Sequence, residues 1–285
     1  MNIGWFSTGR DEAARQLLQA VWENIEAGKI QGKIEFVFSN REQGEAKESD
    51  MFFDLVRHYD IPLVCFSHRK FNERLLRSAR NDKKEDWRIK YDREVDKRIE
   101  KFAPDICVLA GYMLIIGEEL CHNYNMINLH PSVPGGPIGS WQEVMWTLIE
   151  RKAEKAGAMM HLVSSELDRG PVVSYCTFPI RGEPFDRYWQ EIKGHPVSDI
   201  KKRQGEDNRL FQLIREHELI REFPLIILTL QALSRGEISI KDGRVINARG
   251  EPSEGYDLSA RIDQAVEEKI AEPVPSISEE SHSSQ

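Results

Sequence analysis

The stretch that decides the fold is Pro104-Asp105-Ile106-Cys107-Val108-Leu109-Ala110-Gly111-Tyr112-Met113, together with Met126-Ile127-Asn128-Leu129-His130-Pro131-Ser132 shortly after it. Each contains a short apolar run bounded by proline, glycine or polar residues, which is typical of a buried strand. The sequence therefore predicts two strands here, Ile106–Ala110 and Met126–Leu129.

Outward from this stretch, the first 180 residues alternate short apolar runs with longer amphipathic ones. The segment Asp11–Ala27, for example, places its apolar side chains on one face of a helix. This alternation predicts an α/β fold with a doubly wound, mostly parallel sheet, whose ligands bind beyond the carboxyl ends of the strands. The predicted strands are Ile3–Phe6, Ile34–Ser39, Leu63–Phe66, Ile106–Ala110, Met126–Leu129, Ala158–Val163 and Val172–Pro179.

The segment after residue 180 predicts the end of the same domain, which we place at residues 1–248. Arg181–Asn208 is polar and predicts a loop with a short helix. Leu210–Leu233 predicts a long helix, interrupted or bent near Pro224. Ile238–Lys241 and Arg244–Ile246 flank Asp242-Gly243 and predict a type I′ hairpin.

Charge is concentrated in the last residues of the chain. The formal net charge is −8, and residues 251–285 hold nine acidic and two basic side chains, so the overall charge says nothing about the substrate. We expect residues 249–285 to form an acidic, disordered tail, with one short helix at Asp257–Ile270 as an option. Residues 69–101, with thirteen Lys/Arg and eight Asp/Glu, predict a solvated pair of helices. The few aromatics among these bases argue against nucleic acid.

The remaining composition favours a cytoplasmic protein. The four cysteines lack metal-ligand spacing, so we expect reduced thiols and no metal. We find no apolar stretch long enough to cross a membrane and no secretory signal pattern. No dinucleotide fingerprint is present, which argues against a nicotinamide cofactor.

Asn128 and His130 are the first candidate functional residues, because they stand where a predicted strand ends. Strand alternation places both side chains on the same side, so an amide and an imidazole can converge on one reacting centre. Such groups stabilise an oxyanion formed when a carbonyl is attacked. The structural alternative is that they only satisfy local backbone groups.

Asp168 is the third candidate, in the turn Leu167-Asp168-Arg169-Gly170-Pro171 between two predicted strands. Its carboxylate could pair with a histidine and raise the histidine pKa, which would keep the imidazole protonated. Alone, the same pattern is a turn with a capping aspartate.

Taken together, these segments resemble the formyltetrahydrofolate-dependent formyltransferase family. The pair Asn-x-His-Pro-Ser at 128–132 and Leu-Asp-x-Gly-Pro at 167–171 is the specific part. Weaker matches are Val37-Phe38-Ser39-Asn40, Tyr91-Asp92-Arg93-Glu94-Val95, the stretch 104–113 and Val172-Val173, and their order holds over about residues 1–247. The resemblance implies a Rossmann-like formyltransferase fold with a C-terminal helix and hairpin.

The resemblance also implies the chemistry. A small-molecule amine would attack the formyl carbon of 10-formyltetrahydrofolate, the co-substrate. Asn128 would bind the oxyanion, protonated His130 would stabilise it and relay a proton, Asp168 would keep His130 charged, and His161 would support them. The implied folate-binding residues are Gly111, Tyr112, Met113, Leu114, Ile115, Ile116, Ser165, Glu166 and Leu167.

The acceptor site departs from the family pattern. The family's phosphate-binding loop corresponds to Ser7, Thr8, Gly9 and Arg10, which are followed by two acids that oppose a phosphate. The family's ribose-binding glutamate falls on Leu219, with Glu216 and Glu218 nearby, and its folate-wall arginine falls on Leu114.

Several functions therefore stay open. Glycinamide ribonucleotide, in purine biosynthesis, is the leading acceptor, and another amine such as a nucleotide-linked amino sugar is the alternative. A formyltetrahydrofolate hydrolase would use the same three residues, and a folate-binding relative without catalysis is the non-enzyme option. A tRNA substrate is disfavoured by the acidic tail. The partners we expect are thus small molecules, with neither nucleic acid nor membrane; the oligomeric state is open, with a homodimer as one option.

Overall fold

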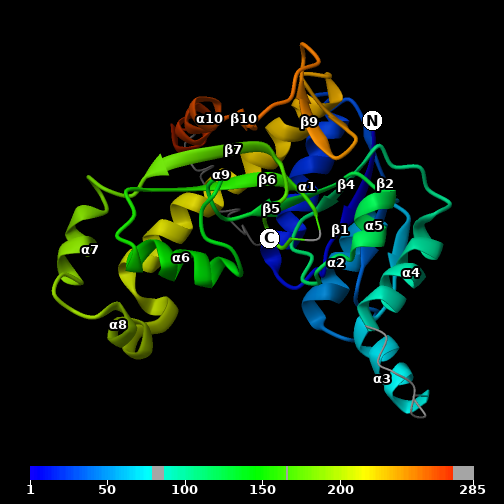
Figure 1. Ribbon diagram of the computed structural model, residues 1–285, viewed down its shortest axis with the longest axis horizontal. Coiled ribbons are helices and arrows are strands. Elements are labelled where there is room, and N and C mark those ends of the chain that lie inside the picture. The colour runs from blue at the N-terminus through cyan, green and yellow to red at the C-terminus, as the bar shows by residue number, and fades with distance from the viewer. Residues whose placement is uncertain (79–86, 165, 272–285) are drawn as a thin grey trace, which may run out of the picture.

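Eight strands form a central sheet in the computed structural model, which describes residues 1–78, 87–164 and 166–271 (Figure 1). Their order across the sheet is β10-β7-β6-β5-β4-β1-β2-β3. The strands are β1 (Asn2–Phe6), β2 (Lys33–Ser39), β3 (Leu63–Cys65), β4 (Ile106–Leu109), β5 (Met126–His130), β6 (Lys155–Leu162), β7 (Val172–Pro179) and β10 (Tyr256–Asp257). The order confirms the predicted doubly wound α/β fold.

The sheet is parallel from β3 to β5, and β6 is its antiparallel member, because it pairs with both β5 and β7 in the opposite direction. β5 and β6 pair with Asn128 opposite His161. This register brings the candidate residues Asn128 and His161 to directly opposite positions on neighbouring strands.

Side-chain alternation along the strands produces a core on each face of the sheet. Trp5 and Val37 face one core, whereas Phe6 and Phe38 face the other. Helices α1 (Glu12–Glu26), α2 (Lys47–His58), α9 (Arg209–Ser234) and α10 (Ser259–Ala271) contribute to the first core. Helices α4 (Trp87–Ile99) and α5 (Glu118–Asn123) contribute to the second. α3 (His68–Ser78) precedes α4, so the predicted pair of charged helices is present on either side of residues 79–86, which lie outside the described part.

A third core extends the molecule beyond the ends of β6 and β7 (Figure 1). It lies among α6 (Trp141–Glu150), the N-terminal half of α9, and two helices inside the segment predicted as a loop with one short helix. These are α7 (Asp186–Glu191) and α8 (Val197–Gln204), with a 3-10 turn at Gly205–Asp207. The sequence predicted only one short helix here, because the side chains that the segment buries, Phe185, Trp189 and Ile200, are few and widely spaced.

Two further predictions concern the long helix α9 and the hairpin that follows it. α9 continues without interruption through Pro224, so the interruption, one of the two predicted outcomes at this proline, is absent from the helix. The hairpin is confirmed as β8 (Ile238–Lys241) and β9 (Arg244–Asn247), with positive φ at both Asp242 and Gly243, as a type I′ turn requires.

Within the expected disordered tail, the optional helix at Asp257–Ile270 is confirmed as α10 (Ser259–Ala271), and residues 256–271 are ordered in place of the expected disorder. β10 adds to the edge of the sheet beside β7, and Leu258, together with Ile262 and Val266 of α10, is buried against the first core. Arg221 of α9 also pairs with Asp263 at 3.0 Å. These three apolar side chains stabilise the segment despite its acidic composition. Residues 272–285 lie outside the described part.

Candidate active site

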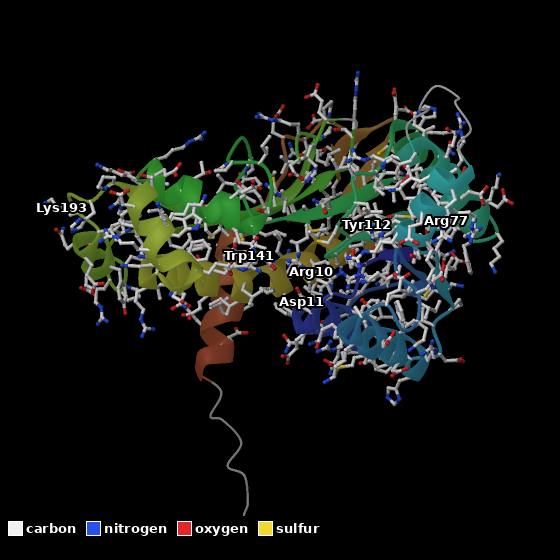
Figure 2. All side chains as sticks on the ribbon, turned by 90° about the horizontal axis from the view of Figure 1, so that it is seen from below. Arg10, Asp11, Arg77, Tyr112, Trp141 and Lys193 are labelled. Atoms are coloured by element: carbon white, nitrogen blue, oxygen red, sulfur yellow. The ribbon has the colours of Figure 1, made fainter. Side chains whose placement is uncertain are left out.

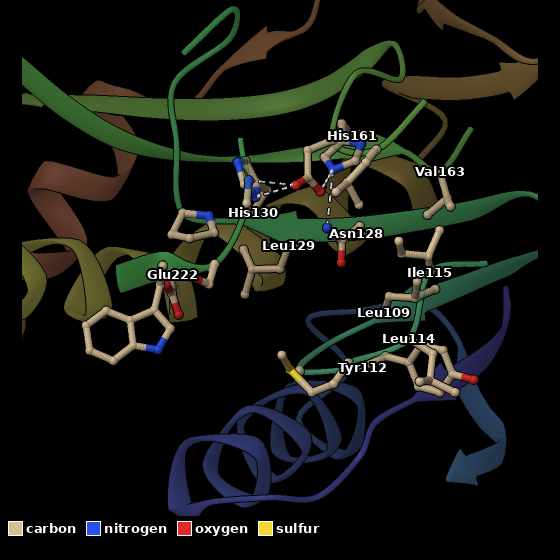
Figure 3. A pocket seen from close by; sticks show the side chains of 18 of the residues that line it. Leu109, Tyr112, Leu114, Ile115, Asn128, Leu129, His130, His161, Val163 and Glu222 are labelled. Carbon is tan, nitrogen blue, oxygen red and sulfur yellow. Dashed lines mark hydrogen bonds and ion pairs between the residues drawn. The ribbon is translucent and has the colours of Figure 1, made fainter. Parts of the chain in front are cut away.

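A cavity of about 460 Å³ lies at the carboxyl ends of β1, β4 and β5 (Figure 3). This is the position at which doubly wound sheets bind ligands. The residues lining it include Arg10, Asp11, Leu109, the segment 111–116, Asn128, His130, Gly139, Trp141, His161, Val163, Glu166, Leu167, Asp168, Arg215 and Glu222.

β5 and β6 position the polar centre of this cavity. Asn128 and His130 stand two residues apart on β5, and His161 is the partner of Asn128 across the β5–β6 ladder. The Asn128 Nδ2 lies 3.2 Å from His161 Nε2, and His161 Nδ1 lies 2.8 Å from the Leu162 carbonyl. Nδ1 donates to that carbonyl, so a neutral His161 ring offers Nε2 as an acceptor for the Asn128 amide. His161 thereby orients Asn128.

Asp168 lies between the two histidines. Its carboxylate oxygens are 3.7 Å from His130 Nδ1 and 3.6 Å from His161 Nε2 (Figure 3). The Gly139 N–H donates to Asp168 Oδ2 at 3.2 Å. Asp168 adopts φ +53, a left-handed conformation that aspartate and asparagine tolerate better than most residues. Gly139 has φ +106, a backbone conformation that other residues rarely adopt, so glycine is favoured at this position.

The electrostatics of the centre bear on one prediction. Burial lowers the pKa of His130, although the hydrogen bond to the Pro137 carbonyl at 3.0 Å and the charge of Asp168 both act to raise it. Desolvation of the imidazolium therefore acts against the expected protonation of His130 in the free protein, and the role of Asp168 in holding that charge stays a prediction. Burial raises the pKa of Asp168, but the nearby His161 and His130 and the N–H of Gly139 lower it overall.

The predicted folate-binding residues largely line the cavity. Gly111–Ile116 follows β4 along one wall, and Glu166 and Leu167 stand on the loop opposite. In Figure 3 the apolar side chains Leu114, Ile115 and Val163 occupy the end of the cavity remote from Glu222, with Asn128 and His130 between the two ends. Ser165, which was also predicted, lies outside the described residues.

The predicted acceptor loop is only partly in the cavity. Arg10 lines it, whereas Ser7, Thr8 and Gly9 are buried behind it. The backbone N–H groups of these three residues donate to the Phe38 carbonyl, the Gly111 carbonyl and Ser7 Oγ. The Thr8 hydroxyl donates to Asn40 Oδ1 at 2.8 Å and accepts from the Met113 N–H at 3.0 Å. These backbone and hydroxyl groups are therefore engaged within the protein.

The predicted glutamates on α9 also do not line the cavity: Glu216 is exposed and Glu218 is fully buried. Instead α9 presents Arg215 and Glu222, which the sequence analysis missed. Arg215 Nη1 contacts Glu222 Oε1 at 2.6 Å and Glu218 Oε2 at 2.8 Å. The spacing of 215, 218 and 222 places these three side chains on one helix face, which is the signal that could have revealed them.

Among the described residues, no group of three or more His, Cys, Asp or Glu is arranged to hold a metal ion. The helices in that part of the chain also include none with the length and apolar character needed to span a bilayer.

The fold and the cavity define a doubly wound α/β enzyme with an amide, two imidazoles and a carboxylate gathered at the strand ends. The chain belongs to the formyl transferase family, whose model matches residues 12–184. It is 30% identical to phosphoribosylglycinamide formyltransferase of Escherichia coli over an alignment of 165 residues. This alignment covers 57% of this chain and 68% of the relative. It is also 27% identical to formyltetrahydrofolate deformylase of Haemophilus influenzae, over 44% of this chain and 39% of that protein.

Solved structures show the same fold. The structure of phosphoribosylglycinamide formyltransferase from Coxiella burnetii matches with a TM-score of 0.61 at 21% identity, covering 90% of this chain and 98% of that one. The structure of glycinamide ribonucleotide transformylase 1 from Symbiobacterium toebii gives a TM-score of 0.59 at 19% identity.

Proposed function

We propose that this chain transfers a formyl group from 10-formyltetrahydrofolate to the primary amine of a small molecule, with glycinamide ribonucleotide as the leading acceptor. The observation that carries the proposal is the convergence of Asn128, His130 and Asp168 on one cavity. The names of the formyltransferase relatives supply the acceptor, and the names of the deformylase relatives supply a formylated tetrahydrofolate.

The cavity fits a reduced folate. Leu109, Leu114, Ile115 and Val163 give one end an apolar wall suited to a flat ring system, and its mouth carries the exposed side chains of Met113 and Leu167. 10-Formyltetrahydrofolate would supply the formyl group, already bound to a nitrogen that can leave.

The polar centre suits attack on a carbonyl. One Nδ2 hydrogen of Asn128 is engaged by His161, and the second can donate to an oxygen that gains negative charge. His130 shares the cavity with Asn128, and both of its ring nitrogens face acceptors, the Pro137 carbonyl and Asp168. A negative charge developing on a bound oxygen would favour the imidazolium. His130 can therefore take up the proton that the attacking amine loses and pass it to the folate nitrogen as the bond from that nitrogen to the formyl carbon breaks.

The first test is an absorbance assay for conversion of 10-formyl folate to tetrahydrofolate, with and without glycinamide ribonucleotide. Conversion that depends on the ribonucleotide supports the proposal. Conversion at the same rate without any amine would favour the hydrolase, the activity named for the deformylase relatives. No conversion with any amine, while folate binds, would overturn formyl transfer and support the folate-binding alternative.

Another amine remains the second candidate acceptor. The observation that favours it is the carboxylate of Asp11 at the start of α1, the helix that follows the predicted phosphate loop.

A further inference from the structure

Thr8 was predicted to bind the acceptor, but its hydrogen bonds go to the segment that was predicted to bind the folate. Thr8 is 2% exposed and does not line the cavity. Its N–H donates to the Gly111 carbonyl at 3.1 Å, and its hydroxyl accepts from the Met113 N–H at 3.0 Å. Thr8 therefore holds the chain on both sides of Tyr112.

Residues 111–116, the predicted folate wall, form a partly exposed span after β4. Gly111 turns the chain out of the strand with φ +70, and Met113 and Ile115 are about half exposed where they line the cavity. Within the described part of the chain, every hydrogen bond made by the backbone of 111–116 goes to Thr8. The next anchor follows at Gly117, whose N–H donates to Asp92 Oδ2 at 2.6 Å. Thr8 is thus the anchor at the β4 end of the wall.

Asn40 fixes the direction of the Thr8 hydroxyl. This residue follows β2, is 1% exposed, and accepts from the Thr8 hydroxyl at Oδ1, at 2.8 Å. Because the hydroxyl proton points to Asn40, the Thr8 oxygen presents a lone pair to the Met113 N–H. A side chain without a hydroxyl at position 8 would leave that N–H and the Asn40 oxygen unpaired in a buried place, which costs free energy.

Thr8 stands in a loop that also reaches the other end of the cavity. Arg10, two residues later, lines the cavity, as does Tyr112, and Figure 2 shows both in the same region of the molecule. The Thr8 carbonyl, however, accepts from the Ser49 hydroxyl of α2 at 3.1 Å. The N–H, the hydroxyl and the carbonyl of Thr8 are therefore all bound by the protein, and the hydroxyl is directed to the folate wall.

We propose that Thr8 is a positioning residue for the formyl donor, and that its hydroxyl sets the backbone of the folate wall through Met113. The inference rests on the proposed formyl transfer and assigns Thr8 to the donor side of that site. A reduced folate packs best on a wall that is already ordered, because a segment that orders only on binding lowers the affinity. Loss of the hydroxyl should therefore weaken the folate and spare the amine.

Two variants of Thr8 test this role. Thr8→Val removes the hydroxyl and keeps the branched shape, whereas Thr8→Ser keeps the hydroxyl. For Thr8→Val we expect KM for the formyl folate to rise about tenfold or more, with kcat and the KM for the amine within about threefold of wild type. Thr8→Ser should keep all three constants within about threefold. A rise in KM for the amine, with KM for the folate unchanged, would return Thr8 to the acceptor site and overturn the inference.

Thr229→Val is the matched control, because it removes another buried threonine hydroxyl. Thr229 lies in α9 outside the cavity lining, and its hydroxyl donates to the Leu225 carbonyl at 2.6 Å. This variant should lower the Tm, as Thr8→Val does, and leave KM for the formyl folate unchanged. An equal rise in KM in the control would show that lost stability, and not the position of the folate wall, weakens the folate, which would overturn the inference.

Asn40→Ala tests the same chain of hydrogen bonds if Thr8→Val does not fold. It keeps the Thr8 hydroxyl and removes the group that directs it, so we expect KM for the formyl folate to rise about threefold. No rise in a folded Asn40→Ala protein would overturn the inference.

Titration calorimetry with tetrahydrofolate alone separates this inference from the proposed function. An unchanged dissociation constant in Thr8→Val, while the wild-type protein transfers formyl groups, would overturn the inference and leave the proposed function standing. Weaker binding in Thr8→Val than in Thr8→Ser and wild type, with no formyl transfer to any amine, would support the inference and overturn the proposed function.

Discussion

At the centre of the cavity the polar groups come from two hydrogen-bonded strands, β5 and β6, whereas at the acceptor end they come from the start of α1 and one face of α9. The strand ladder fixes Asn128 opposite His161 by register alone. The acceptor end depends on how two helices distant in the sequence pack across the sheet. The contrast shows that strand register places Asn128 and His161 at the cavity centre, whereas tertiary packing places the side chains at the other end.

Among the variants of the cavity centre, His130→Ala is expected to have the largest effect on activity. We expect formyl transfer to fall by about a thousandfold or more, because a positioned acid–base group supplies about that much. Folate binding should persist, since the apolar wall is formed by other residues. Turnover is measured by the folate absorbance change and binding by quenching of protein fluorescence; full activity in this variant would remove His130 from the mechanism.

The sequence was sufficient to predict that these side chains lie together, whereas their catalytic roles stay predictions. A strand that ends in Asn128-Leu129-His130 fixes the relative placement of two side chains, and the turn at 167–171 returns Asp168 to the same edge. The sequence did not reveal how burial and the nearby acceptors together set the pKa of His130. Burial depends on what packs over β5, including the segment that carries Pro137, so the lowered pKa emerged only with the fold.

Asp168→Asn tests whether the negative charge of Asp168 contributes to activity. Asparagine tolerates the positive φ at this position, so the backbone should be preserved. We expect kcat to fall about a hundredfold, because the charge that favours the imidazolium is lost. The pKa of His130 should fall further, which two-dimensional NMR of the ring protons would detect. An unchanged rate would leave Asp168 as a structural turn residue.

The acceptor end was less predictable for a physical reason. Ser7, Thr8 and Gly9 have the composition of an anion-binding loop, but their N–H groups are engaged by β2, by the strand end at Gly111 and by Ser7 itself. Such pairing is decided by neighbouring strands, and a local motif does not reveal it. Likewise Glu216, Glu218 and Glu222 are equally acidic in the sequence, and only the packing of α9 places Glu222 in the cavity.

Asp11 offers a smaller test at that end, with two variants that separate charge from capping. Asp11→Asn should keep the N-cap and its stability, whereas Asp11→Ala should lower the free energy of unfolding by about 1 kcal/mol. Both remove a negative charge beside Arg10, so the preference for glycinamide ribonucleotide over glycinamide riboside, which lacks the phosphate, should rise about threefold or more. Urea unfolding and steady-state kinetics measure the two effects. An unchanged preference would mean that Asp11 does not repel the acceptor phosphate.

The smallest expected effect is the titration of His130 itself. Because burial lowers its pKa, the folded protein binds fewer protons than the unfolded chain just below the ordinary histidine value of about 6.5. The contribution of this group to stability is therefore full above that pH and is lost as the pH falls through the lowered value. NMR should place the His130 midpoint below that of histidine in an unstructured peptide, and a bound anion that mimics a formyl oxyanion should raise it. A midpoint above the peptide value would show that Asp168 and the Pro137 carbonyl outweigh burial, and the imidazolium would then be present before the substrate binds.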